Sequence, residues 1–286
     1  MKRMMTLVLS LAIALSILSP ATAYAAGAEC REHNYSRTYD DKTFESDICN
    51  QCGFVRVHYT PYALPFVTRN EGIVAREAPR KAANVVKSYD SAGTGIQVVG
   101  RVRNEYNNLW LLLSDGSYTF ADNAAFDFDA MARYAASSVN ALAGPRACYM
   151  TYSPWEGLKA SCTPSTIGIY GSMFSHFQPG GAFDLKQPDK LGLNTYDYYV
   201  YANGGLQEER YTGEKLGNIL YGYMARKVGI SERNAIRYAG LADRPQFGDT
   251  LACFFLGDLS RCDDEEDIDM IKLGWNRFSR RTQGGW

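Results

Sequence analysis

The residues best suited to acid–base chemistry lie in a glycine-rich block at residues 180–186, which reads GGAFDLK. The two glycines allow a sharp turn, so we expect a loop, anchored by Phe183, that presents Asp184 and Lys186 together. An apolar neighbour disfavours the ionised form of a carboxyl group, which suits a general acid. The alternative is an aspartate that only caps amides within the turn. We interpret Asp184 and Lys186 as catalytic residues and place Gly181 at the substrate.

A second polar block lies on a segment with helical periodicity. Apolar residues repeat at helical spacing over residues 214–228, which predicts a helix there. Asn218 and Tyr221 lie off this apolar stripe, together with Gly217 and Gly222. Close helix packing alone would explain the glycines, whereas the Asn218 amide can both donate to and accept from a substrate. We therefore assign substrate binding to Asn218 and Tyr221.

A third block, DDEED at residues 263–267, supplies further carboxylates. Acidic groups in the first turn of a helix cap its amides and stabilise its dipole, which is the ordinary interpretation of such a run. We nevertheless expect Asp264 or Asp267 to face Asp184 as a catalytic partner, because cleavage of a glycosidic bond needs two opposed carboxylates. A divalent cation held by several of these carboxylates is the alternative.

His176 is the only histidine beyond residue 58 and directly precedes the glycine-rich block. An isolated histidine between aromatic residues is more often packed than catalytic. A catalytic zinc hydrolase needs two or three histidine ligands, and a ribonuclease of the His-pair type needs two histidines. A Cys/His amidase would need a free thiol in an oxidising compartment. These absences favour carboxylate chemistry that requires no cofactor, with His176 or Lys186 as an auxiliary.

The N-terminus has the layout of a secretory signal. Lys2 and Arg3 precede an apolar run at residues 7–18 and a small-residue cleavage stretch at residues 21–26. The apolar run is too short to span a bilayer. Cleavage lowers the basic count from 30 to 28 against 31 acidic residues, so the net charge changes from −1 to −3. We expect a periplasmic or secreted protein with no membrane span after cleavage, and its charge argues against a nucleic-acid target.

All seven cysteines follow the predicted signal and would enter an oxidising compartment. Cys148 and Cys162 are close in sequence, as are Cys253 and Cys262. Each pair predicts a disulfide that closes a short loop.

The other three cysteines lie near the N-terminus and cannot all pair with one another. Cys30-x-x-His33 and Cys49-x-x-Cys52 have the spacing of a four-ligand structural zinc site. The alternative is one disulfide from Cys30, with the third thiol either free or paired with another chain. The sequence leaves both interpretations open.

The elements that must position these residues begin with short strands over residues 71–123. Strands are expected at residues 72–75, 84–86, 95–102, 109–113 and 118–120, with a hairpin turn at residues 114–117. Closely spaced short strands predict a small barrel. The segment resembles a bacterial SH3-like (SH3b) domain, a module that commonly binds peptidoglycan, at residues 76–79, Gly95, residues 107–110 and residues 115–116.

For the rest of the chain we expect mainly helices. An amphipathic helix is expected after Asp127, strands at residues 165–170 and 196–201, and helices at residues 214–228, residues 231–240 and from residue 263. We therefore predict a multidomain protein in which a small all-β SH3-like barrel precedes an α+β, helix-dominated C-terminal domain. The expected boundaries are a signal peptide (1–25), a Cys-rich segment (26–62), the SH3-like domain (63–124), a helical connector (125–145) and the C-terminal domain (146–286).

Taken in order, the three polar blocks resemble the bacterial polymorphic toxin type 44 family, whose members show GG-x-x-D-x-K, GN-x-x-YGY and DD-x-x-D blocks. The resemblance covers residues 177–278. It implies a toxin domain with its active site at these blocks, and an immunity protein in the producing cell.

Three functions are consistent with these features. The first is an exported antibacterial cell-envelope hydrolase that binds peptidoglycan through the SH3-like module and cleaves its glycan strand. The second is a ribonuclease toxin, an activity often proposed for the type 44 family, and only this alternative implies a nucleic-acid partner. The third is a non-catalytic peptidoglycan-binding envelope protein. Export and the absence of a thiol or zinc amidase site favour the first.

Overall fold

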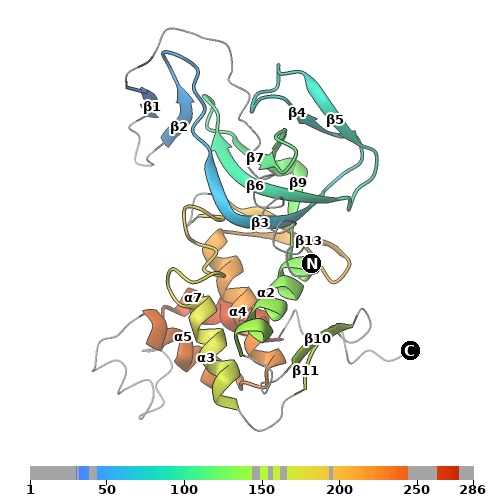
Figure 1. Ribbon diagram of the computed structural model, residues 1–286, viewed down its shortest axis with the longest axis vertical. Coiled ribbons are helices and arrows are strands. Elements are labelled where there is room, and N and C mark those ends of the chain that lie inside the picture. Colours follow the sequence, from blue (N-terminus) through green and yellow to red (C-terminus); the bar gives the residue numbers. More distant parts are fainter. Residues whose placement is uncertain are drawn as a thin grey trace, which may run out of the picture.

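A mixed sheet of nine strands forms the upper part of the molecule in the computed structural model (Figure 1). The structure describes residue 30 and residues 32–38, 44–143, 149–153, 157–161, 166–192, 196–243 and 263–276. The strand order is β13-β12-β9-β3-β6-β7-β8-β4-β5. In chain order, these strands are β3 (His58–Thr68), β4 (Ile73–Arg76), β5 (Val85–Tyr89), β6 (Gly95–Arg103), β7 (Leu109–Leu113), β8 (Tyr118–Phe120), β9 (Ala124–Asp127), β12 (Tyr198–Ala202) and β13 (Gly205–Tyr211).

Two small hairpins are not part of this sheet. One pairs β1 (Tyr35–Thr38) with β2 (Phe44–Cys49), and the other pairs β10 (Tyr149–Ser153) with β11 (Gly157–Ser161). The helices gather below the sheet (Figure 1). They are α2 (Phe128–Ala143), α3 (Thr166–Phe177), α4 (Gly213–Lys227), α5 (Glu232–Asp243) and α7 (Glu265–Asn276).

The prediction of a closed SH3-like barrel followed by a separate helix-dominated domain is wrong. The strands expected over residues 72–120 do form, but β3 precedes them and pairs with both β6 and β9. β12 then adds in parallel to β9, and β13 extends the same edge, so the sheet stays open. Pairing between strands about 75 residues apart leaves no local signal in a sequence, and the sheet therefore continues past the expected boundary at residue 124.

The segment at residues 166–170, expected as a strand, is instead the first part of α3. Isoleucine and tyrosine favour strands locally, but tertiary packing overrides such preferences. The helix buries Met173 and Ser172 on one side, and the Ser172 hydroxyl donates to the carbonyl of Val139 in α2 at 2.8 Å. The expected strand at residues 196–201 and the expected helix at residues 214–228 are confirmed as β12 and α4.

One hydrophobic core joins the sheet to the helices. Phe66 of β3, Phe126 of β9 and Tyr198 of β12 pack together, with ring centroids 5.6 and 6.0 Å from Phe66. Phe128 of α2 continues the core to Tyr223 of α4, at 5.5 Å. Burying each such ring contributes roughly 2 kcal/mol. The core therefore fixes the helical layer, and the site that it carries, against the sheet.

Close glycine contacts hold α4 against α7. A Cβ on Gly222 would lie 2.1 Å from the carbonyl oxygen of Ile271, and one on Gly274 would lie 2.0 Å from that of Ile219. Gly222 is thus required for helix packing. Residues 1–29, which contain the expected signal, and the disulfide candidates Cys148, Cys162, Cys253 and Cys262 lie outside the described residues. Among the helices that are described, none has the length and apolar character needed to cross a membrane.

Candidate functional site

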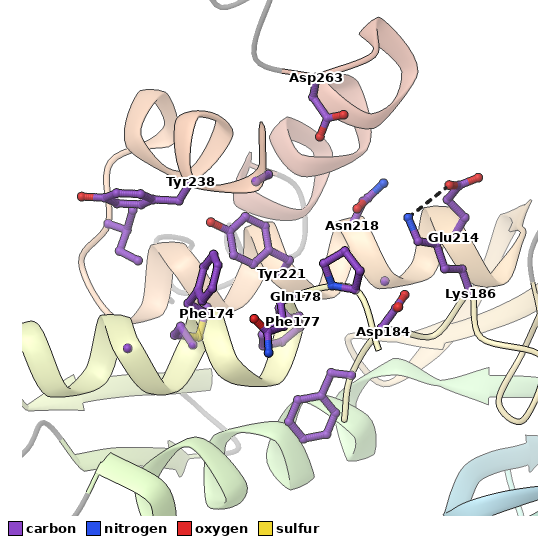
Figure 2. A pocket seen from close by; sticks show the side chains of 17 residues that line it. Phe174, Phe177, Gln178, Asp184, Lys186, Glu214, Asn218, Tyr221, Tyr238 and Asp263 are labelled. Atoms are coloured by element: carbon purple, nitrogen blue, oxygen red, sulfur yellow. Dashed lines mark ion pairs between the residues drawn. The ribbon is translucent and has the colours of Figure 1, made fainter. Parts of the chain in front are cut away.

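A cavity of about 430 Å³ lies among α3, α4, α5 and the loop that follows α3 (Figure 2). We call it the Asp184 cavity. Its wall contains four of the residues predicted for catalysis or substrate binding: Asp184, Lys186, Asn218 and Tyr221. Other lining residues include Phe174, Phe177, Gln178, Glu214, Tyr238 and Asp263. Three blocks that are distant in sequence therefore meet at one cavity.

Asp184 is buried in the wall of this cavity, with 7% of its surface exposed. Its Oδ2 atom accepts hydrogen bonds from the Gly180 amide at 2.8 Å and from Gln187 Nε2 at 2.5 Å. Both partners are N–H donors, so this oxygen acts as an acceptor. Oδ1 has no hydrogen-bond partner within the described part of the chain. Oδ2 thus fixes the side chain in the wall of the cavity.

Phe183 anchors the loop beside Asp184, as expected. It is 1% exposed and stacks on His176, with ring centroids 5.4 Å apart and an interplanar angle of 16°. Its amide donates to the His176 carbonyl at 2.9 Å. His176 Nδ1 lies 2.8 Å from the carbonyl of Ser172, and its ring is not part of the cavity wall. His176 therefore packs against the loop and is not among the described residues that line the cavity.

Gly181 serves the packing of this loop. A Cβ at this position would lie 2.4 Å from the His176 carbonyl oxygen, so no larger residue fits without a shift of the backbone. The Gly181 carbonyl accepts from Nζ of the buried Lys190 at 2.9 Å. Tyr62 of β3 donates to the neighbouring Ala182 carbonyl at 2.6 Å. The sheet and the buried Lys190 thus hold the loop, and Gly181 is not among the described residues that line the cavity.

Lys186 pairs with a residue that the sequence reasoning missed. Its Nζ lies 3.7 Å from Glu214 Oε1, in the first turn of α4 (Figure 2). Gly213 allows this turn to approach the loop, since a Cβ there would lie 2.3 Å from the Gly192 carbonyl oxygen. The Thr212 side chain caps α4 by accepting from the Lys215 amide. The feature of the sequence that could have identified Glu214 is the glycine directly before it.

The acidic block does not supply the partner that was expected. Asp267 accepts from Asn218 Nδ2 at 2.7 Å and so orients that amide, while Asp264 is exposed. Asp263 is the member that lines the cavity; it is 6% exposed and accepts from the Asp264 amide at 2.9 Å. Figure 2 shows Asp263 apart from Asp184, with Asn218 between them and the Lys186–Glu214 ion pair to one side. Glu214 and Asp263 are the acidic residues that line the cavity together with Asp184, and Asp264 and Asp267 are not among its described lining residues.

Aromatic rings form the remaining wall of the cavity. Phe174 and Phe177 come from α3, and Tyr221 and Tyr238 come from α4 and α5. The Tyr221 hydroxyl donates to the carbonyl of Ala235 at 3.0 Å, and burial raises the pKa of this phenol. Tyr221 thus stays neutral and ties α4 to α5. A mostly apolar cavity with a few convergent polar groups is the usual form of a small-molecule site.

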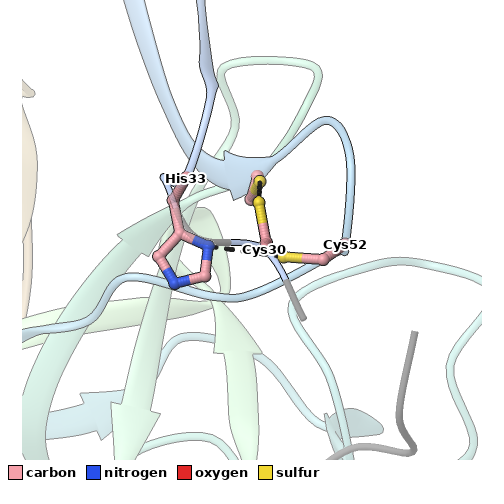
Figure 3. A group of neighbouring side chains, drawn as sticks. Cys30, His33 and Cys52 are labelled. Carbon is pink, nitrogen blue, oxygen red and sulfur yellow. Dashed lines mark hydrogen bonds between the residues drawn. The ribbon is translucent and has the colours of Figure 1, made fainter. Parts of the chain in front are cut away.

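A second site lies at the N-terminal hairpin. The ligand atoms of Cys30, His33, Cys49 and Cys52 all lie within 4.8 Å of one another (Figure 3). Cys30 Sγ and Cys49 Sγ are 3.9 Å apart, and Cys52 Sγ lies 3.3 Å from His33 Nδ1. Tetrahedral ligands around zinc are separated by about 3.8 Å, so the four groups fit one ion. All three cysteines are free thiols, and the cluster could hold a metal ion.

The backbone around this cluster suits a bound thiolate. β2 ends at Cys49, and a tight turn follows in which Gly53 has a φ of 69° and donates to the Cys49 carbonyl at 2.9 Å. Burial opposes ionisation of Cys49, but backbone amides at Cys52 and Gln51 lower the pKa of its thiol to about 6. Metal ligands are oriented by such outer hydrogen bonds.

Comparison of the chain with protein-family models, curated proteins and solved structures finds no match. The resemblances to the type 44 toxins and to the SH3b domain therefore stay predictions. The described residues establish an aromatic cavity that brings Asp184, Lys186, Glu214 and Asn218 together, and a Cys/His cluster that could hold a metal ion.

Proposed function

We propose that the protein is a cell-envelope hydrolase that cleaves a glycan strand in the Asp184 cavity. The observation that carries this proposal is the way hydrogen bonds hold the carboxylate of Asp184. Two donors hold its Oδ2, Oδ1 has no hydrogen-bond partner among the described residues, and the residue lines an aromatic cavity. A carboxylate fixed in this way is preorganised for chemistry on a bound molecule.

Glu214 supplies the second carboxyl group that glycosidic cleavage requires. One group protonates the leaving oxygen and the other activates a water or attacks the sugar. Asp184, in the loop after α3, and Glu214, in the first turn of α4, both line the cavity. Lys186, ion-paired with Glu214 at 3.7 Å, adds a positive charge beside the reacting oxygens. No cofactor is required for this chemistry.

The lining of the cavity supports a sugar as the ligand. Pyranose rings present apolar C–H faces and polar hydroxyl edges, so they need both flat apolar walls and directed hydrogen bonds. Phe174, Phe177 and Tyr238 offer the first, and Asn218, oriented by Asp267, offers the second. Peptidoglycan is the proposed source of the glycan because the sequence predicts an exported protein. The proposal uses no SH3-like module, since that barrel is not formed.

We further propose that the metal of the N-terminal cluster is structural zinc. Three thiols and one imidazole, without a place for water, form a closed Cys₃His ligand set. Purified protein should contain one zinc ion per chain by elemental mass spectrometry, and Cys49→Ser should lose it. A metal-free wild-type protein with a Cys30–Cys49 disulfide would reject zinc in favour of the alternative pairing.

The test of the hydrolase is product identification. Purified protein without the predicted signal is incubated with intact peptidoglycan sacculi and, in parallel, with structured RNA, and soluble products are identified by mass spectrometry. Disaccharide-peptides with new reducing or anhydro ends are expected, and heat-denatured protein should release none. Cleavage of RNA without release from sacculi would contradict the glycan proposal in favour of a ribonuclease. If neither sacculi nor RNA gives a product, the result would favour a non-catalytic peptidoglycan-binding protein.

A further inference from the structure

A second cavity, of about 470 Å³, lies where the N-terminal hairpin meets the sheet. We call it the Arg101 cavity. It is lined by residues of β2, β3, β6 and β7 and by the loop at residues 186–192. The charged and polar lining residues that matter here are Asp47, His58, Arg101, Arg103, Lys186 and Gln187.

Positive charge dominates this lining. Asp47 is the one acidic residue among the described lining residues, and it already has several partners. Its Oδ1 accepts from Arg56 NH2 at 3.1 Å and lies 3.1 Å from His58 Nε2, and its Oδ2 accepts from the Arg103 amide at 2.8 Å. Arg56 lies outside the lining and takes up the charge of Asp47. Lys186 is ion-paired with Glu214, and Arg103 donates from its guanidinium to Asn107, so Arg101 is the cation of this lining to which the described residues supply no ion pair.

The buried guanidinium of Arg101 is the main evidence that the cavity binds an anion. It is 7% exposed, and its guanidinium donates to the carbonyls of Pro188 and Leu191, each at 2.6 Å. Its Nε has no hydrogen-bond partner, and within the described residues Arg101 forms no ion pair. Neutral carbonyls orient a guanidinium but do not cancel its charge. A buried charge without a counter-ion is costly, and an anion in the cavity would remove this cost.

His58 gives the cavity a further oriented polar group. Asp47 fixes one nitrogen of its ring at 3.1 Å, and the side chain is 41% exposed. The other ring nitrogen has no partner among the residues that the structure describes. With one N–H directed to Asp47, the second nitrogen can donate to an oxyanion when the ring is in its imidazolium form.

We propose that the Arg101 cavity binds an oxyanion, a phosphate or carboxylate group, through Arg101, Arg103 and Lys186, with His58 as a further donor. Planar guanidinium groups match the geometry of both anions, and such charge-assisted hydrogen bonds are stronger than neutral ones. The proposal does not depend on the hydrolase activity of the Asp184 cavity. Its failure would leave that activity untouched.

Titration of the zinc-loaded protein with inorganic phosphate, and separately with acetate, tests the proposal. Calorimetry at low ionic strength gives the affinity, and ¹H–¹⁵N spectra show which groups respond. We expect saturable binding of one anion with a Kd of about 1 mM, with shifts of the Arg101 Nε–H resonance. Tighter binding of phosphate identifies a phosphate site, and tighter binding of acetate identifies a carboxylate site.

Two variants and one control keep the test specific. Arg103→Gln and His58→Gln should each weaken binding about tenfold, because each removes one donor to the anion. Arg80→Gln, at an exposed arginine outside the cavity, should leave binding unchanged. The proposal is wrong if neither anion saturates the wild-type protein. It is equally wrong if both cavity variants bind as tightly as Arg80→Gln.

Discussion

The Asp184 cavity and the Arg101 cavity are of similar size but opposite chemistry. The first has aromatic walls with Asp184, Glu214 and Asp263 as its acidic groups, and the charged residues that line the second are Arg101, Arg103 and Lys186 with Asp47. They share one loop: Lys186 lines both, and Gln187 lines the second cavity while donating to Asp184 in the first. A single loop therefore positions groups for two different tasks.

Two kinds of residue can therefore be distinguished: those that hold the shared loop in place and those that line one of the cavities. A change in what holds the loop should disturb both cavities, whereas a change in one lining should disturb only that cavity. Lys186 is the exception, because it belongs to both walls. The predictions below use these contrasts.

Gly181→Ala should damage both cavities and have the largest effect on stability. The added Cβ would lie 2.4 Å from the His176 carbonyl oxygen, so the loop must move away from α3. We expect the free energy of unfolding to fall by about 3 kcal/mol, measured by denaturant unfolding, with loss of both hydrolysis and phosphate binding. Gly95→Ala, where a Cβ meets nothing within 4 Å, is the control. Loss of only one function would show that the loop is not shared.

Glu214→Gln should affect the Asp184 cavity alone. Removal of an acid–base group lowers kcat by about 100-fold, since such groups typically contribute this much or more. Phosphate binding should not weaken, because Glu214 does not line the Arg101 cavity and its negative charge competes with the anion for Lys186. Steady-state hydrolysis and calorimetry on the same preparation measure both. A kcat within threefold of wild type, on the order of experimental scatter, would remove Glu214 from the mechanism.

Lys186→Gln should weaken both functions moderately. The variant keeps a hydrogen-bonding side chain but removes the charge that pairs with Glu214 and faces the second cavity. We expect about a tenfold loss in kcat/KM and about a tenfold rise in the phosphate Kd. Lys87→Gln, an exposed lysine of β5, is the matched control. An effect on hydrolysis with none on phosphate would assign Lys186 to the Asp184 cavity alone.

Phe174→Ala should give the smallest effect. Phe174 is 45% exposed and lines the aromatic wall, so its loss should weaken sugar binding with little change in stability. A stacking contact of about 1 kcal/mol corresponds to about a fivefold rise in KM with kcat unchanged. A fall in kcat instead would mean that this ring positions the reacting groups.

The sequence predicted the contents of the Asp184 cavity better than the architecture around it. The glycine-rich block carries its own turn signal, and helical periodicity located Asn218 and Tyr221, so these residues were found together. Glu214 was missed because an acidic residue in a first helical turn is ordinary; its place depends on Gly213 meeting the Gly192 carbonyl. Asp263, and not Asp264 or Asp267, reaches the cavity.

The sheet shows what local patterns leave out. β7 and β8 form where strand composition and a turn predict them. The parallel pairing of β12 with β9 joins segments that are far apart in the chain, and only the packing of both against one core decides it. The oriented pair of Asp47 and His58 is likewise a product of tertiary structure, since 3.1 Å separates groups from two sheets.

Hydrolysis of peptidoglycan sacculi by Asp184→Asn is the most direct test of the central claim. The substitution keeps the shape of the side chain, and Asp269→Asn, at an exposed position of α7, is the matched control. We predict that Asp184→Asn lowers the rate by about 10²- to 10⁴-fold while phosphate binding and melting temperature stay close to wild type. A rate equal to that of Asp269→Asn would show that the Asp184 cavity is not the active site.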